Sequence, residues 1–375
     1  MNALLGLVWV SCGLWAPQQP TATRADLARS YQRFDKAYAS AELTPERKRE
    51  LNLAFDRSTM AFFMGQGAQV IADLERLSDS LGAPPPAAPP EEPAHDWDAA
   101  RLALLAKLPG VSPENEPQRQ ALAAVRARIE LLRNTLSPGD SAQFLVERPK
   151  LAAEVEAELA LVVRGEDPYR RRTGDLWRVV ALERGELPVH LYAPPAAAQD
   201  EPLPLLIALH GMGGDENMFF EGYGAGRLRA LAEQRGFLLA CPRANWLLSG
   251  ATLERLIRAL SYDYAIDEKR ILLLGHSMGS GLAASIAARA PERFAGLACF
   301  AGGPGAKAEK LPPSWISVGA LDPIANPDSL EKASKALTAR GLTVRFERVP
   351  DLGHTLVVGE RLGAAVEFLL GQQLP

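Results

Sequence analysis

Apolar residues in the first half of the chain recur every three or four positions, which is the spacing of one face of an α-helix. The pattern starts with Leu27, Tyr31, Phe34 and Tyr38. Thr44 is a suitable N-cap for a second helix, with Pro45 in its first turn, and an apolar stripe continues from there to Leu81. These periods predict a helical region that begins near residue 21.

A proline-rich segment divides this helical region. Residues 82–93 read GAPPPAAPPEEP, and so many prolines exclude a helix and stiffen the chain as an extended linker. Beyond it, Ser112-Pro113 is expected to open a helix, and a last helix should run through Val155 and Val162. The region ends near residue 165. It offers no grouping of nucleophile, base and metal-ligand residues, so we interpret it as a packing module.

From Gly174 onward the apolar period becomes that of β-strands. A hairpin around Arg184-Gly185 is expected first, followed by short apolar runs that alternate with amphipathic helical stretches. The eight predicted strands are 177–182, 187–192, 205–209, 237–240, 271–274, 297–300, 316–318 and 344–348. This alternation predicts an α/β domain over residues 174–375, with a mainly parallel eight-stranded sheet and helices on both faces.

The overall composition narrows the possible partners. A chain of 375 residues is long enough for two domains, and 23% charged with 47% hydrophobic residues is typical of globular proteins. The formal net charge of -4 gives no broad positive field of the kind that binds nucleic-acid phosphates. Nucleic acid is therefore not an expected partner.

The first 20 residues are treated separately because they contain an apolar run from Ala3 to Trp15. This run is too short to span a bilayer but suits the core of a signal peptide. We expect a signal peptide or membrane tether and a secreted, periplasmic or surface-tethered protein, although no Lys or Arg precedes the run and Pro17 follows it. Cys12 is a candidate for lipidation after cleavage.

One short motif has the form of a nucleophile elbow. The predicted strand 271–274 leads directly into Gly275-His276-Ser277-Met278-Gly279, and an alanine-rich helical stretch follows. A serine at such a turn is lifted above the sheet, and a glycine two residues away on each side lets strand and helix approach closely. Ser277 is thus the candidate nucleophile.

A serine hydroxyl needs a base to remove its proton, and the base needs a third group to orient it. His354 follows the last predicted strand in a loop before the final helix, and we expect it to be the base. Asp322 comes directly after strand 316–318 and is the expected acid. Asp328 and Asp351 are weaker alternatives, because one starts a predicted helix and the other adjoins the histidine.

The other histidines are expected to be structural rather than catalytic. They are His95 in the helical region, His190 in the hairpin, His210 before a glycine loop and His276 in the elbow.

The loop after strand 205–209 reads His210-Gly211-Met212-Gly213-Gly214 and resembles an oxyanion-hole loop. Two backbone N–H groups must already point at the developing negative charge of the intermediate. We assign these donors to Met278 and Met212, with Gly211 as the alternative. A nearby apolar cluster is expected to bind the acyl part of the substrate: Met218, Phe219 and Phe220.

The chain resembles members of the α/β-hydrolase superfamily, in particular its carboxylesterases, feruloyl-esterase-like and polyhydroxybutyrate-depolymerase-like proteins. Two segments carry this resemblance, LIALHGMGGDEN and GHSMGS. The resemblance covers the chain from about Gly174 to its end. It implies the α/β-hydrolase fold and a serine hydrolase with the order Ser277, Asp322, His354. Ser280 stands where such relatives often have glycine. The helical region lies outside the resemblance.

The sequence therefore predicts an enzyme that cleaves a small-molecule or polymer-attached carboxylic ester, with no metal or organic cofactor. A serine peptidase of the prolyl-oligopeptidase type uses the same residues and stays open, as does a non-catalytic cell-surface binding protein that works through the helical region. Only residues 302–314 separate strands 297–300 and 316–318, which leaves no room for a lid there. An open site is expected unless the helical region folds over it as a roof. Protection of residues 94–165 from protease by an active-site inhibitor would reveal such a roof.

Overall fold

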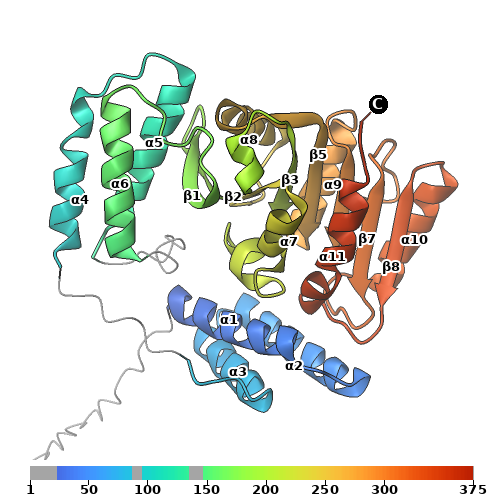
Figure 1. Ribbon diagram of the computed structural model, residues 1–375. Helices are drawn as coiled ribbons and strands as arrows, with labels where there is room; N and C mark the ends of the chain where they lie inside the picture. Colours follow the sequence, from blue (N-terminus) through green and yellow to red (C-terminus); the bar gives the residue numbers. More distant parts are fainter. Residues whose placement is uncertain (1–22, 87–94, 135–146, 375) are drawn as a thin grey trace, which may run out of the picture.

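The computed structural model describes residues 23–86, 95–134 and 147–374. Its centre is one eight-stranded sheet with the order β1-β2-β4-β3-β5-β6-β7-β8 (Figure 1). β1 and β2 form an antiparallel hairpin, β2 runs antiparallel to β4, and all later neighbours are parallel. The strands are β1 Gly174–Ala181, β2 Glu186–Ala193, β3 Leu203–Leu209, β4 Leu238–Pro242, β5 Ile266–His276, β6 Gly296–Phe300, β7 Ser314–Gly319 and β8 Val344–Val349. The predicted eight-stranded, mainly parallel sheet is confirmed.

Helices cover both faces of the sheet, and the reason is visible in the central strand. β3 is buried along its whole length, with Leu205 and Ile207 in one apolar cluster and Leu206 and Ala208 in the other. Such strands need cover on both faces. α8 Gly250–Asp263 and α9 Met278–Arg289 pack on the first face, whereas α7 Arg227–Arg235 and α11 Leu356–Leu370 pack on the second. α10 Pro327–Ala339 lies against β7 and β8 at the sheet's edge.

Three N-terminal helices pack together into what we call the helical cap, residues 24–80: α1 Arg24–Ser40, α2 Pro45–Phe63 and α3 Gly67–Ser80. Thr23 caps α1, and Thr44 caps α2 by accepting the N–H of Arg47. The second helix, whose apolar stripe was expected to continue to Leu81, ends at Phe63 instead. The chain turns at Gly65, whose φ of 76° is unfavourable for other residues, so the apolar stripe folds back as α3.

The next helices pack elsewhere: α4 Trp97–Leu105, α5 Glu116–Glu130 and α6 Arg148–Val163. They share an apolar cluster with Leu176 of β1, and the buried guanidinium of Arg128 bonds both the Glu158 carboxylate and the Trp177 carbonyl. The helix expected from Ser112-Pro113 begins at Glu116 instead, because Asn115 accepts the N–H of Gln118 and so caps it. The short helices are η1 Leu108–Gly110, η3 Pro195–Ala198 and η4 Met218–Gly222.

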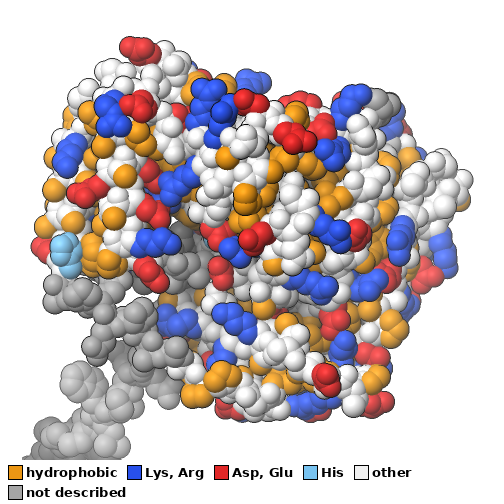
Figure 2. All heavy atoms as spheres, in the orientation of Figure 1, with side chains coloured by type: hydrophobic (Ala, Val, Ile, Leu, Met, Phe, Trp, Pro, Cys, Tyr) orange, Lys and Arg blue, Asp and Glu red, His pale blue; other side chains and the backbone are white. Residues whose placement is uncertain are grey.

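Several sequence-based expectations fall outside the described residues, namely the apolar run of residues 3–15, Cys12 and most of the proline-rich linker. Within the described ranges, no helix has both the length and the apolar content needed to cross a bilayer. On the face drawn in Figure 2, basic and acidic side chains are interspersed rather than gathered by sign.

Candidate active site

Ser277 occupies a strained turn between β5 and α9. Its φ of 52° and ψ of −115° are rare for a residue with a side chain, and its N–H donates to the Phe300 carbonyl at 2.9 Å. The flanking glycines are required sterically. A Cβ at Gly275 would lie 2.4 Å from the Gly279 carbonyl oxygen, and a Cβ at Gly279 would lie 2.0 Å from that of Leu209. The strand and helix therefore meet only because both positions lack side chains.

The structure brings Ser277, His354 and Asp322 into one chain of hydrogen bonds. Nε2 of His354 lies 3.0 Å from the Ser277 hydroxyl oxygen. Nδ1 of the same ring lies 2.9 and 2.8 Å from the two carboxylate oxygens of Asp322. Because a carboxylate only accepts, Nδ1 holds the proton, and Nε2 is then free to accept the proton of the hydroxyl.

Backbone groups fix the Asp322 carboxylate in place. Its Oδ1 accepts the N–H groups of Ile324 and Ala325, both at 2.8 Å. The alternative acids point elsewhere, since Asp328 pairs with Arg348 and Asp351 with Arg49. Of the three carboxylates that the sequence offers, Asp322 is therefore the one that contacts the His354 ring.

The expected oxyanion-hole loop follows β3 and is held by His210. The Ala244 N–H donates to Nε2 of His210, so the proton is on Nδ1, which donates to the Gly211 carbonyl at 2.8 Å. Burial lowers the pKa of His210 and keeps the ring neutral. The structural role expected for His210 agrees with these contacts.

The Gly211 N–H is directed to the Tyr223 hydroxyl at 3.3 Å, which makes Gly211 the weakest of the three oxyanion candidates. Met278 is the first residue of α9, where helix geometry leaves the N–H without a partner inside the helix. Met212 lies on the loop itself, and its residue is 50% exposed.

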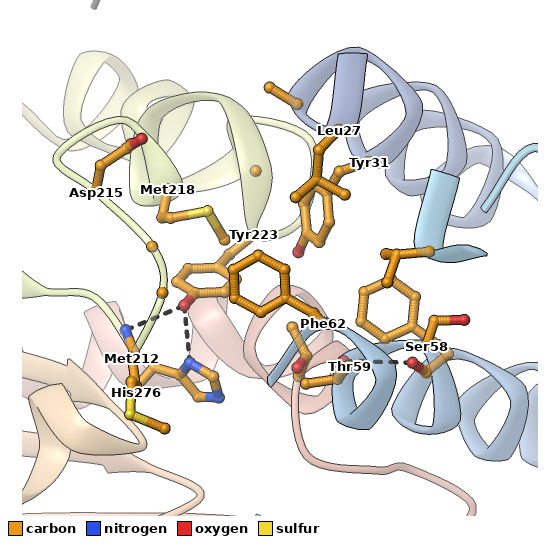
Figure 3. Close-up of a pocket in the computed structure, with 18 of the residues that line it drawn as sticks. Leu27, Tyr31, Ser58, Thr59, Phe62, Met212, Asp215, Met218, Tyr223 and His276 are labelled. Carbon is orange, nitrogen blue, oxygen red and sulfur yellow. Dashed lines mark hydrogen bonds between the residues drawn. The ribbon is translucent and has the colours of Figure 1, made fainter. Parts of the chain in front are cut away.

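A relay of hydrogen bonds joins loop 210–214 to the loop that presents His354, and Figure 3 shows its two bonds at the Tyr223 hydroxyl. Nε2 of His276 lies 3.1 Å from the His354 carbonyl, which can only accept, so the proton of His276 is on Nε2. Its Nδ1 therefore accepts from the Tyr223 hydroxyl at 2.8 Å, and that hydroxyl accepts the Gly211 N–H. Burial, with the nearby His354, holds the pKa of His276 well below its usual range. The elbow histidine thus ties three segments of the site together.

Two polar residues of α2, which the sequence did not single out, hold the loop that presents His354. The Gly353 N–H donates to Oδ1 of Asn52 at 2.7 Å, and the His354 N–H donates to Oδ2 of Asp56 at 2.9 Å. A Cβ at Gly353 would lie 2.0 Å from that same Asp56 oxygen, so the contact requires glycine.

The Asp56 carboxyl is buried, and its Oδ1 has no hydrogen-bond partner. Burial raises its pKa to about 6, against the opposing effect of the His354 N–H. The sequence contains a pattern that could have pointed to these two residues of α2. Asn52 and Asp56 are four residues apart beside Leu51 and Phe55, so polar groups fall on the apolar face of the predicted helix.

The helical cap lies opposite Ser277 and forms one side of a half-open cavity of about 200 Å³. Leu27 and Tyr31 of α1 and Phe62 of α2 face Met218 and Tyr223 across it (Figure 3). The site therefore stays partly open, and the alternative of a helical roof holds for the side that the helical cap forms. Residues 24–80 form that roof, whereas the described part of residues 94–165 packs against β1.

The predicted acyl-binding residues are divided by the structure. Met218 lines the cavity, but Phe219 and Phe220 are 1% and 2% exposed and belong to the core beneath it. Phe220 stacks on His190 with a centroid distance of 3.7 Å, which also accounts for that histidine. The alternation of side chains in η4 directs one member of the predicted cluster outward and two inward.

Comparison with known proteins gives a family for part of the chain. Residues 244–366 match the model of the Dienelactone hydrolase family. A segment of 120 residues is 33% identical to the bifunctional acetylxylan esterase/xylanase XynS20E of Neocallimastix patriciarum, and it covers 28% of this chain but only 17% of that protein.

Solved structures of low identity were also found. A thermostable esterase has 21% identity and a TM-score of 0.47, covering 53% of this chain and 63% of its own. A ferulic acid esterase from Anaeromyces mucronatus has 14% identity and a TM-score of 0.42, covering 51% of this chain and 90% of its own.

The matched family model spans the strand that ends at the elbow, the elbow itself and the loops that present Asp322 and His354. This part of the chain is therefore similar to the Dienelactone hydrolase family, and the eight-stranded sheet has the α/β-hydrolase-like fold that the sequence predicts.

Proposed function

We propose that this chain is a serine hydrolase that cleaves a carboxylic ester through an acyl-enzyme intermediate. The observation that carries the proposal is the unbroken hydrogen-bonded chain from the Ser277 hydroxyl through His354 to Asp322, set at a strained turn. A turn of this kind costs about 1–3 kcal/mol, and such strain is typical of functional sites.

The reaction follows from the positions of these groups. The Ser277 oxygen attacks the ester carbonyl carbon while Nε2 of His354 takes the hydroxyl proton, and Asp322 stabilises the imidazolium that forms. His354 then gives that proton to the departing alcohol, which leaves an acyl group on Ser277. A water molecule, deprotonated by the same Nε2, attacks the acyl carbon, and the carboxylic acid is released as Ser277 regains its proton.

The backbone N–H groups of Met278 and Met212 are the proposed donors to the oxygen that becomes negative during attack. Removing one such donor costs about 3–4 kcal/mol in a comparable enzyme. The relay from Gly211 through Tyr223 to His276 supports this assignment, because it holds the oxyanion loop and the base loop in fixed relation before substrate arrives.

The expected substrate is a small-molecule or polymer-attached ester. The relative of Neocallimastix patriciarum is named as an acetylxylan esterase, which supports an ester of a plant polysaccharide as one source. We also propose that residues 1–20 direct export and that Cys12 is a lipid attachment site. Cell fractionation and mass spectrometry of the mature N-terminus test both points.

Covalent labelling tests the proposal most directly. A fluorophosphonate probe should label the full chain, and Ser277→Ala should abolish labelling and lower kcat by at least about 10⁴-fold. Ser329→Ala, at an exposed serine of α10, is the matched control and should behave as wild type. An unlabelled Ser277 would contradict the proposal and favour a binding protein. Faster turnover of a peptide anilide than of a p-nitrophenyl ester would instead indicate a peptidase.

A further inference from the structure

The cavity under the helical cap opens onto the reacting groups. Ser277 and His354 belong to its wall, and so do the residues of the oxyanion loop from Gly211 to Asp215. The opposite wall is made by the helical cap, which the resemblance to α/β-hydrolases does not cover. We infer that the helical cap forms the acyl-binding site of this enzyme and selects esters with an apolar acyl group of about four to eight carbons. This inference rests on the proposed function.

The lining of the cavity decides the chemical class. The helical cap contributes mainly aliphatic and aromatic side chains, including Leu27, Phe55, Val70 and Leu74. The charged side chains of the wall, apart from histidine, are the acidic Asp215 and Glu221, and no Lys or Arg of the described residues lines it. An anionic acyl group would be repelled by these carboxylates, so the site favours a neutral apolar group.

The size of the cavity sets the length of the acyl group. A dry apolar cavity of about 150 Å³ in another protein holds one benzene ring. A cavity of about 200 Å³ therefore fits a group somewhat larger than one ring, such as a hexanoyl chain. An acetyl group would leave most of this apolar wall uncovered, and the end of a dodecanoyl chain would extend beyond the cavity into water.

Most of the cavity wall on the side of the α/β domain lies along the oxyanion loop rather than at His354, and on this ground we assign the cavity to the acyl side. The carbonyl oxygen must face the N–H groups of Met212 and Met278, so the acyl chain continues along the oxyanion loop. The cavity follows that loop from Gly211 to Asp215 and then reaches Met218. The departing alcohol must stay next to Nε2 of His354, which donates its proton.

Phe62 explains why the helical cap and the oxyanion loop form one wall. A Cβ placed on Gly213 would lie 2.3 Å from Cε1 of Phe62, so the aromatic ring rests directly on the backbone of that loop. Gly213 has a φ of 80° and no side chain, so the backbone of the loop turns there and contacts the Phe62 ring directly.

The test is a series of p-nitrophenyl esters from acetyl to dodecanoyl, measured as kcat/KM with the full chain. Burial of each methylene should raise kcat/KM up to about fourfold until the cavity is filled near hexanoyl, with a decline beyond octanoyl. Ala28 lines the cavity from α1, whereas Ala39 on the same helix is exposed. Ala28→Leu should shift the optimum to butanoyl or shorter, and the control Ala39→Leu should leave it unchanged.

Leu27→Ala enlarges the same cavity and should shift the optimum toward octanoyl or longer, which keeps the test informative if Ala28→Leu unfolds. A flat or declining dependence from acetyl onward, with Ser277 still labelled by fluorophosphonate, would overturn the acyl-site inference while leaving the proposed hydrolase intact. Absence of labelling would instead overturn the proposed function. The inference would also be refuted if kcat/KM depended on the length of the alcohol rather than of the acyl group, and if Ala28→Leu altered that dependence.

Discussion

The carboxylate of Asp56 offers the sharpest test of how the helical cap supports catalysis. It accepts the backbone N–H of His354 at 2.9 Å from a residue 298 positions away in the sequence. Asp56→Ala removes this acceptor and leaves the N–H buried without a partner. The His354 loop would then shift to satisfy the N–H, and the ring would leave the position that is 3.0 Å from the Ser277 hydroxyl.

The magnitude follows from the cost of a buried unsatisfied donor, which is about 1–3 kcal/mol. If that cost appears in the transition state, kcat/KM falls about 5- to 150-fold. Asp56→Asn keeps an acceptor oxygen in the same place, so we expect it to stay within about threefold of wild type. Asp79→Ala is the control, because that carboxylate lies in the same helical cap but is 68% exposed.

The pH dependence separates the charge of Asp56 from its geometry. Burial raises the pKa of this carboxyl to about 6, so the group is neutral below that pH and ionised above it. A hydrogen bond to an ionised acceptor is stronger than one to a neutral acceptor. Asp56→Asn should therefore match wild type at pH 5 and lose kcat relative to it at pH 8.

The assay is steady-state hydrolysis of a p-nitrophenyl ester at several pH values, with circular dichroism and Tm to verify folding. A loss in kcat with little change in KM is expected, since the mutation disturbs the base rather than the substrate cavity. A folded Asp56→Ala variant with kcat/KM within twofold of wild type would refute the reasoning.

Three further predictions concern the elbow, the oxyanion loop and the buried carboxyl of Asp35 in α1. Gly275→Ala places a Cβ 2.4 Å from backbone and should lower kcat/KM more than 100-fold in ester hydrolysis, whereas Gly281→Ala, with open space at its Cβ, should not. Gly213→Ala should lower kcat through its clash with Phe62, and a double-mutant cycle with Phe62→Ala should show partial rescue; additive losses would disprove the contact. Burial raises the pKa of Asp35 to about 7, above its value in the unfolded chain, so its contribution to stability is complete below about pH 4 and is lost as pH rises to about 7. In the wild type, the free energy of unfolding should fall by up to about 4 kcal/mol across this pH range because of Asp35. Asp35→Asn should remove this fall, as measured by urea titrations at several pH values.

Much of the fold could be predicted because local patterns specify it. Each strand is a short apolar run bounded by turn residues, and β3 is uninterrupted because both of its faces are buried. Helix ends were less predictable. The apolar stripe through Val70 and Leu74 has the same period whether or not the chain reverses before it, so the turn at Gly65 was missed.

The catalytic candidates could be found because tight turns and strand ends leave marks in the sequence. Gly275 and Gly279 flank Ser277 for a steric reason that holds in any chain with this turn. The assignment of Phe219 and Phe220 to the acyl site failed because their inward direction depends on the local path of η4. Composition alone does not distinguish a cavity wall from the core behind it.

The sequence by itself determined the sheet, the elbow and the candidate nucleophile, acid and base, because each is marked by the residues next to it in the chain. Only the tertiary structure decided that the helical cap lies over one side of the site, that Asp56 and Asn52 hold the His354 loop, and that the described part of residues 94–165 packs against β1. The physical reason is that an amphipathic helix encodes an apolar face but not its partner. Which surface that face buries depends on the shape and polar groups of a segment some 300 residues away.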